Sequence, residues 1–216
     1  MVNYSESSTT VGQRIFLWSV ALLMIVGTVG SFVALVFANE NQQKDQARFN
    51  QLYQEYQAEV DVQSKELSEK YYPDLKKFSE ERVSEFDGAS VAELSHVDLI
   101  VGDGEVLNED SSFTAYYVGW GPDGVIFDQS IDGDSLKAPL DVYSGSVIEG
   151  WHEGVVGMKV GGMRELTIPS DKAYGETGSG NSIPPNTPLK FIVFIIPTPE
   201  AVEPSQELLD LNNRLG

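Results

Sequence analysis

The longest uninterrupted hydrophobic pattern in the chain lies close to its N-terminus. Residues 15–38, IFLWSVALLMIVGTVGSFVALVFA, form a run of 24 residues without a charge. As a helix this run is roughly 36 Å long, and the hydrocarbon core of a bilayer is about 30 Å thick. The pattern predicts a transmembrane helix, or signal anchor, over 15–38, preceded by a short tail over 1–14.

Two other interpretations of this run stay open. Val36, Phe37 and Ala38 are acceptable before a signal-peptidase cut, although a cleaved signal usually has an apolar core of only about 7–15 residues. The third alternative is a buried helix of a soluble protein. Arg14 precedes the run, so the positive-inside rule favours a single-pass cell-membrane protein with its C-terminal part outside the cytoplasm. Cleavage would instead give a secreted protein.

The pattern after the apolar run is helical. Residues 39–87 carry apolar or aromatic side chains mostly three or four positions apart: Phe49, Leu52, Tyr53, Tyr56, Val60, Leu67, Tyr71, Leu75 and Phe78. Pro73 predicts a break, with a second helix starting after Tyr72. We expect a helical stalk that serves as a spacer or as a coiled-coil homodimer contact. The alternative is a helix pair packed against its own domain.

From Val97 onwards, short β-type runs alternate with turn residues. The predicted strands cover 97–101, 112–120, 125–129, 140–143, 162–168 and 189–196, and one short helix fits 149–157. In 189–196 both alternating faces are apolar, which predicts a strand covered on both sides. The expected fold is α+β: an antiparallel sheet wrapped around one helix, within a domain over 88–197. An acidic C-terminal tail over 198–216 contains a predicted terminal helix, 204–215.

Composition excludes several kinds of function. The chain has 14 Lys and Arg against 33 Asp and Glu, a net charge of −19, so we expect no nucleic-acid partner. It has no cysteine and two histidines, which excludes disulfides, thiolate zinc sites and thiol nucleophiles. Asp128 begins a DxSxDG string, but position twelve of a calcium loop would be Pro139 instead of Glu. We expect neither a metal nor a cofactor.

A set of aromatic and aliphatic residues is spread over the β-rich part. Its members are Tyr117, Phe127, Trp151, Tyr174 and Phe191, accompanied by Val147, Ile148 and Ile183. Without the surrounding sequence, these residues would be interpreted as ordinary members of a hydrophobic core. The strings around them are YVGWGPDGVIFDQS, GSVIEGWHEGVVGMKVGGMRELTIP, AYGETGSG and IPPNTPLKFIVFII. In this order they closely resemble the FKBP-type peptidyl-prolyl cis-trans isomerases, over roughly residues 94–197.

The resemblance implies an FKBP-like fold with an apolar pocket between a curved five- or six-stranded sheet and the short helix. It implies three catalytic groups: the Asp128 carboxylate, directed at the twisting amide, the Tyr174 hydroxyl and the Ile148 backbone N–H. Trp151 would form the pocket floor. The other substrate-binding positions that it implies are Tyr117, Phe127, Phe191, Val147, Ile183, Leu140 and Val142.

The activity implied is isomerisation of X–Pro bonds, assisting the folding of exported proteins. The expected partners are proline-containing, unfolded or exported polypeptides and a tacrolimus-type macrolide. Leu140 and Val142 replace aromatic residues of the family, Gln129 replaces a Ser, and Ser179 stands where His is frequent. The loop over 131–137 is longer than in compact members. A catalytically weak, tethered holdase or scaffold is the alternative, and a third interpretation makes the aromatic stalk the working surface.

Overall fold

A computed structural model describes the backbone of residues 11–215 and the side chains of residues 41–215. The chain forms two compact units. One combines the residues up to Gln57 with those from Glu203 onwards, and the other comprises Ala58–Val202.

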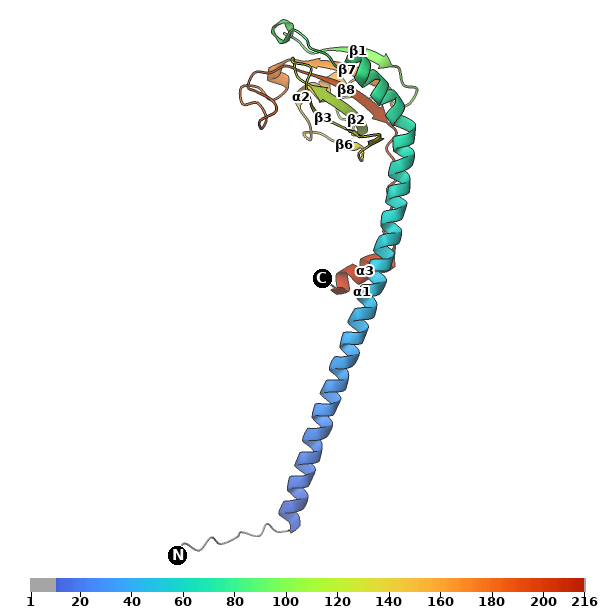
Figure 1. The fold of residues 1–216 in the computed structure, drawn as a ribbon, viewed down its shortest axis with the longest axis vertical. Coiled ribbons are helices and arrows are strands. Elements are labelled where there is room, and N and C mark those ends of the chain that lie inside the picture. Colours follow the sequence, from blue (N-terminus) through green and yellow to red (C-terminus); the bar gives the residue numbers. More distant parts are fainter. Residues whose placement is uncertain (1–10, 216) are drawn as a thin grey trace, which may run out of the picture. The chain divides into compact units, whose positions relative to one another are not determined.

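A single helix, α1 (Val11–Arg82), replaces the two helices predicted around Pro73. Proline removes the N–H that would bond to the Glu69 carbonyl, at a cost of about 3 kcal/mol in a helix interior. Tyr71 and Leu75, on either side of Pro73, are buried against the sheet. Each contributes about 1.5–3 kcal/mol through burial, which offsets that cost. Figure 1 shows α1 changing direction near its C-terminal end, as a proline inside a helix predicts.

The predicted membrane helix, 15–38, falls within α1, but its side chains lie outside the described residues. In the part of the chain that the structure describes, we find no helix with the length and hydrophobicity needed to span a bilayer.

In the first unit, a C-terminal helix packs against α1. This helix, α3 (Gln206–Leu215), confirms the predicted terminal helix. Leu208 and Leu211 bury themselves against Leu52, with Phe49 and Tyr56 alongside. Arg48 adds a two-pronged ion pair to Glu207, with both N–O distances 2.8 Å. Part of the apolar and aromatic pattern over 39–87, for which a coiled-coil homodimer contact was one alternative, is therefore covered by the chain's own α3. Dimerisation stays a prediction.

The second unit contains a six-stranded antiparallel sheet. Its strands are β1 (Ser95–Ile100), β2 (Phe113–Trp120), β3 (Ile126–Gln129), β6 (Leu140–Val142), β7 (Met163–Ile168) and β8 (Leu189–Ile196). Their order is β1-β7-β8-β2-β3, and β6 pairs with the first residues of β2. Each of the six predicted strands is confirmed to within two residues. The predicted loop over 131–137 contains a small hairpin, β4 (Ile131–Asp132) and β5 (Ser135–Leu136).

The sheet is covered on both faces, as the pattern of β8 predicted. Alternate β8 residues (Leu189, Phe191, Val193, Ile195) pack with α2 (Glu149–Gly154), and we call this side the α2 face. Ile192, Phe194 and Ile196 pack with the end of α1 and the β4–β5 hairpin, on the side we call the α1 face. The helix predicted over 149–157 is confirmed, with an earlier end.

Polar contacts also attach the end of α1 to the sheet. Glu165 of β7, only 3% exposed, accepts from Arg82 Nε at 2.6 Å and from Lys190 Nζ at 2.9 Å. Ser68 Oγ accepts from the Leu136 N–H at 2.9 Å. This half of the predicted stalk is thus packed against its own domain, and the compact unit begins at Ala58.

Candidate active site

Four aromatic rings meet on the α2 face. The Trp151 ring stands edge-on to Tyr117, with centroids 5.5 Å apart at 78°, and to Phe191, at 5.4 Å and 83°. Phe127 stands edge-on to Phe191 at 5.6 Å and 83°. Such T-shaped pairs are a preferred geometry for aromatic side chains. The structure thus brings together the predicted floor and the three predicted walls, from α2, β2, β3 and β8; we call these four residues the aromatic cluster.

Two glycines allow this convergence. A Cβ on Gly119 would lie 2.6 Å from Phe191 Cε1 and 2.8 Å from Phe127 Cζ, closer than atoms pack. A Cβ on Gly150 would lie 2.3 Å from Ile168 Cγ2. Gly119 therefore leaves room for both rings on β2, and Gly150 lets α2 lie directly on β7.

A buried arginine fixes the end of α2. Arg164, 5% exposed, donates from Nη1 to the carbonyls of Gly154 at 2.8 Å and Val156 at 3.2 Å. Its Nε donates to Asp98 Oδ1 at 2.6 Å. The hydrogen bond from Arg164 lowers the pKa of Asp98, so the carboxylate stays ionised and balances the buried guanidinium. The helix that carries Trp151 is thereby held to β7 and β1.

Asp128 lies at the mouth of the cluster with both carboxylate oxygens engaged. Oδ2 accepts from the Tyr117 hydroxyl at 2.5 Å, and Oδ1 accepts from the Gln129 N–H at 2.8 Å. Burial, and then the bond to Asp128, raise the pKa of Tyr117 well above its usual range. Tyr117 therefore remains a neutral donor that orients the carboxylate.

Tyr174 and Ile148 offer groups that a substrate can use. Tyr174 is 38% exposed, and burial followed by the Asp128 charge raises its pKa, so its hydroxyl stays protonated. Ile148 precedes α2 in extended conformation, and its carbonyl accepts from the Trp151 N–H at 3.0 Å. Its own N–H has no hydrogen-bond partner among the described residues. Val147 packs beside it against the core of the α2 face.

The remaining predicted binding residues differ in how deeply they are buried. Ile183 lies against the same core and is joined by two backbone hydrogen bonds to Ser179. Val142 is 1% exposed within the core, whereas Leu140 of β6 is 37% exposed. Neither Leu140 nor Val142 lines the cavity described next.

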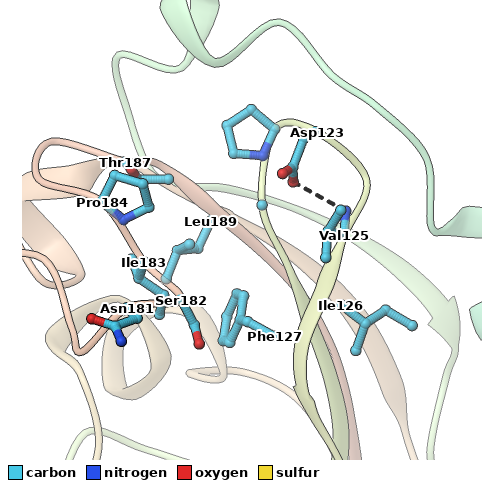
Figure 2. Close-up of a pocket in the computed structure, with 12 residues that line it drawn as sticks. Asp123, Val125, Ile126, Phe127, Asn181, Ser182, Ile183, Pro184, Thr187 and Leu189 are labelled. Atoms are coloured by element: carbon cyan, nitrogen blue, oxygen red, sulfur yellow. Dashed lines mark hydrogen bonds between the residues drawn. The ribbon is translucent and has the colours of Figure 1, made fainter.

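A cavity of about 550 Å³ lies beside the aromatic cluster and shares only Phe127 and Ile183 with the predicted binding residues. Figure 2 shows it between the β2–β3 turn and the loop before β8. Its lining is Gly121, Pro122, Asp123, Val125, Ile126, Phe127, Asn181, Ser182, Ile183, Pro184, Thr187 and Leu189. No pattern in the sequence indicates this cavity. The β2–β3 turn lies within one of the strings that resemble the family, and the loop before β8 begins between two others, but nothing in their spacing indicates that the two loops face each other.

No cluster of three or more His, Asp or Glu suited to a metal ion occurs within the described residues.

Comparison with known proteins gives one consistent family. Residues 103–196 match the FKBP-type peptidyl-prolyl cis-trans isomerases. An FK506-binding protein of Neisseria meningitidis serogroup A is 43% identical over 101 residues, which cover 46% of this chain and 90% of that protein. FK506-binding protein 4 of Dictyostelium discoideum is 42% identical over 105 residues, 48% of this chain and 28% of that one. A solved peptidyl-prolyl cis-trans isomerase from Pseudomonas syringae pv. tomato is 33% identical, covers 59% of this chain and 94% of its own, and has a TM-score of 0.43.

Proposed function

Because the chain belongs to the family of FKBP-type peptidyl-prolyl cis-trans isomerases and is such an enzyme, we propose that it acts on exported polypeptides from a membrane anchor over 15–38. The observation that carries the site assignment is the edge-on contact of Trp151 with Tyr117 and Phe191. These rings build an apolar pocket floor beside an oriented carboxylate.

The reaction requires no covalent step. Rotation about an X–Pro bond breaks amide resonance, with a barrier of about 18–20 kcal/mol. The twisted amide is less dipolar than the planar one, so a dry aromatic pocket favours the transition state relative to the ground state. A thousandfold acceleration requires only about 4 kcal/mol of such preference. Apolar walls and a few fixed dipoles can supply this.

We assign roles to the polar groups on this basis. Tyr117 and the Gln129 N–H fix the Asp128 carboxylate, whose field acts on the rotating amide. The unpartnered Ile148 N–H and the half-exposed Tyr174 hydroxyl bind carbonyl oxygens of the substrate. Fixed groups act without reorganising during the rotation.

The proposal of an exported, membrane-tethered enzyme is supported by the sequence. Residues 15–38 are long enough to span a bilayer as a helix and carry no charge, and Arg14 precedes them. A chain without cysteine tolerates an oxidising compartment.

We also propose that the aromatic cluster binds a macrolide of the FK506 type, since the relatives from Neisseria and Dictyostelium are named for that ligand. Ser179 and Gln129 replace residues frequent in the family at the rim. We expect these two positions to change affinity without abolishing binding.

Two substitutions test the catalytic roles. Asp128→Asn should keep the fold and most of the peptide affinity while lowering kcat/KM several-fold, because only transition-state stabilisation is lost. Tyr174→Phe should have a smaller effect, since one neutral hydrogen bond contributes about 0.5–1.5 kcal/mol. The measurements are the isomerisation rate of an X–Pro peptide panel and the peptide Kd.

Asp110→Asn provides a matched control, because Asp110 is an exposed carboxylate in the turn before β2. An unchanged rate in Asp128→Asn would remove Asp128 from catalysis. Tight binding of unfolded chains by a wild-type protein without measurable acceleration would leave the tethered holdase as the function.

A further inference from the structure

We infer that the cavity between the β2–β3 turn and the 181–187 loop binds an extended segment of the substrate polypeptide that flanks the X–Pro bond. An apolar side chain of that segment would lie against the apolar lining. This inference rests on the proposed function, because it takes the X–Pro bond itself to bind at the aromatic cluster.

The cavity borders the proposed binding site. Phe127 and Ile183 belong to both. The Phe127 ring contacts Phe191 of the aromatic cluster and also lines the cavity. A chain that leaves the aromatic cluster past these two side chains would therefore reach the cavity. Any unrelated occupant would compete with the substrate for the same side chains.

Its size and chemistry suit a peptide segment. A volume of about 550 Å³ lies within the roughly 300–1,000 Å³ of binding pockets in general. Phe127, Ile183 and Leu189 give it an apolar side, as Figure 2 shows. Polar side chains of Asn181, Ser182 and Thr187 are also part of the lining. This combination can hold an apolar side chain while hydrogen bonding to the backbone that carries it.

One wall is preformed. In the β2–β3 turn, Gly121 N–H donates to the Val125 carbonyl at 3.1 Å and Gly124 N–H to the Gly121 carbonyl at 3.0 Å. Asp123 Oδ1 accepts from the Val125 N–H at 3.1 Å, the dashed line in Figure 2. Phe86, which follows α1 and is not part of this turn, donates its N–H to the Pro122 carbonyl at 3.0 Å. A wall held in this way needs little ordering when a ligand binds.

The opposite wall offers donors. The Ser179–Ile183 pair closes the base of the loop, and the N–H groups of Asn181 and Ser182 at its tip have no partners among the described residues. An extended chain can supply carbonyl oxygens to these groups. Backbone hydrogen bonds would then give affinity, while the apolar side of the cavity selects the side chain.

The charge of the cavity lining and of the whole chain determines which peptide segments can bind. Asp123 is the only ionisable side chain among the residues lining the cavity, all of which are described, and the whole chain carries −19. An acidic residue in the flanking segment would be repelled. We therefore expect a preference for apolar over acidic flanking residues.

The experiment compares the full chain with two variants on peptides of different length. One substrate is an X–Pro tetrapeptide, and four others extend it by four residues on the N-terminal or the C-terminal side, with either a Leu or a Glu in the extension. Val125→Glu places a charge on the cavity wall, where Val125 is 60% exposed. Val101→Glu is the matched control, because Val101 is 78% exposed and lies outside the cavity.

With the wild-type chain, one of the two Leu-containing extensions should raise kcat/KM about five- to tenfold over the tetrapeptide, equivalent to roughly 1–1.4 kcal/mol. The Glu-containing extension on the same side should not raise kcat/KM. Val125→Glu should remove the gain and leave the tetrapeptide rate unchanged, while Val101→Glu keeps both.

Four results would overturn the inference. Equal rates for short and extended peptides, or a retained gain in Val125→Glu, would show that the cavity is not used while the proposed function stands. An equal loss on short and extended peptides would show that Val125 acts on the aromatic cluster instead. A wild-type chain that isomerises none of the peptides would contradict the proposed function itself, and this inference with it.

Discussion

At the scale of single residues, the missing side chain of Gly119 determines how the aromatic cluster packs. Phe127 and Phe191 occupy the space next to its Cα that a methyl group would need. The sequence could not reveal this, because a glycine in a strand pattern equally predicts a bulge or a weak point. The aromatic residues themselves can be identified as site residues only through the strings that surround them.

Gly119→Ala should therefore displace both rings. We expect a loss of about 1–3 kcal/mol in the free energy of unfolding, as for other overpacked cores, and weaker peptide binding. Thermal unfolding and peptide Kd measure the two effects. Adding Phe191→Leu should relieve the clash and restore part of the stability without restoring affinity. Unchanged affinity in a folded Gly119→Ala protein would show that substrate does not bind between these rings.

At the scale of elements, the position of α2 depends on the chain of contacts from Asp98 through Arg164 to the Gly154 carbonyl. The native pKa of Asp98 is depressed below its unfolded value of about 3.9. This interaction therefore stabilises the native state at pH values above the unfolded pKa. The contribution is lost as pH falls through the native pKa.

Asp98→Asn should consequently lower the thermal midpoint at pH 7, and the difference from wild type should shrink as pH falls below about 4. Thermal unfolding between pH 7 and pH 3 checks this, with Asp110→Asn as the exposed control. Other carboxylates titrate in both proteins and cancel in the difference. A difference that is constant over the whole range would show that the native pKa of Asp98 is not depressed.

The elements also show where sequence reasoning succeeds and where it stops. The strands can be predicted because short β-type runs alternate with turn residues along the chain. The two apolar faces of β8 also predict that both sides of this strand are covered. The β4–β5 hairpin could not be predicted, because its strands have two residues each and depend on distant contacts such as Ser68 with Leu136. The rule that placed a helix start after Tyr72 failed because burial of Tyr71 and Leu75 together offsets the local cost of the proline.

At the scale of the whole molecule, the family match at 103–196 covers less than the compact unit, which runs from Ala58 to Val202. The end of α1 covers a face of the sheet that would otherwise expose Tyr116, Ile192 and Phe194. Burial, and then the nearby Tyr71, raise the pKa of Tyr116 to about 12. The α1 segment from residue 58 onwards is thus structural for the enzyme domain.

The proposed anchor over 15–38 would determine where the whole molecule is found in the cell. The intact protein should sediment with membranes, and a chain lacking 15–38 should not, because the uncharged segment is removed. In cells stripped of their outer wall, added protease should digest the domain over 88–216. Protection of that domain would contradict the predicted orientation, and a mature N-terminus at Asn39 would show cleavage instead of anchoring.

Covering both faces of one sheet has a spectroscopic consequence. Trp151 belongs to the α2 face, whereas Trp120 is buried on the α1 face, with its indole N–H donating to the Ser84 carbonyl at 3.2 Å. The third tryptophan, Trp18, lies in the apolar N-terminal run. Proteins that keep only Trp151 or only Trp120 would therefore emit from two separate environments. Quenching of Trp151 alone by a proline peptide would then be distinguishable from detachment of α1 from the opposite face.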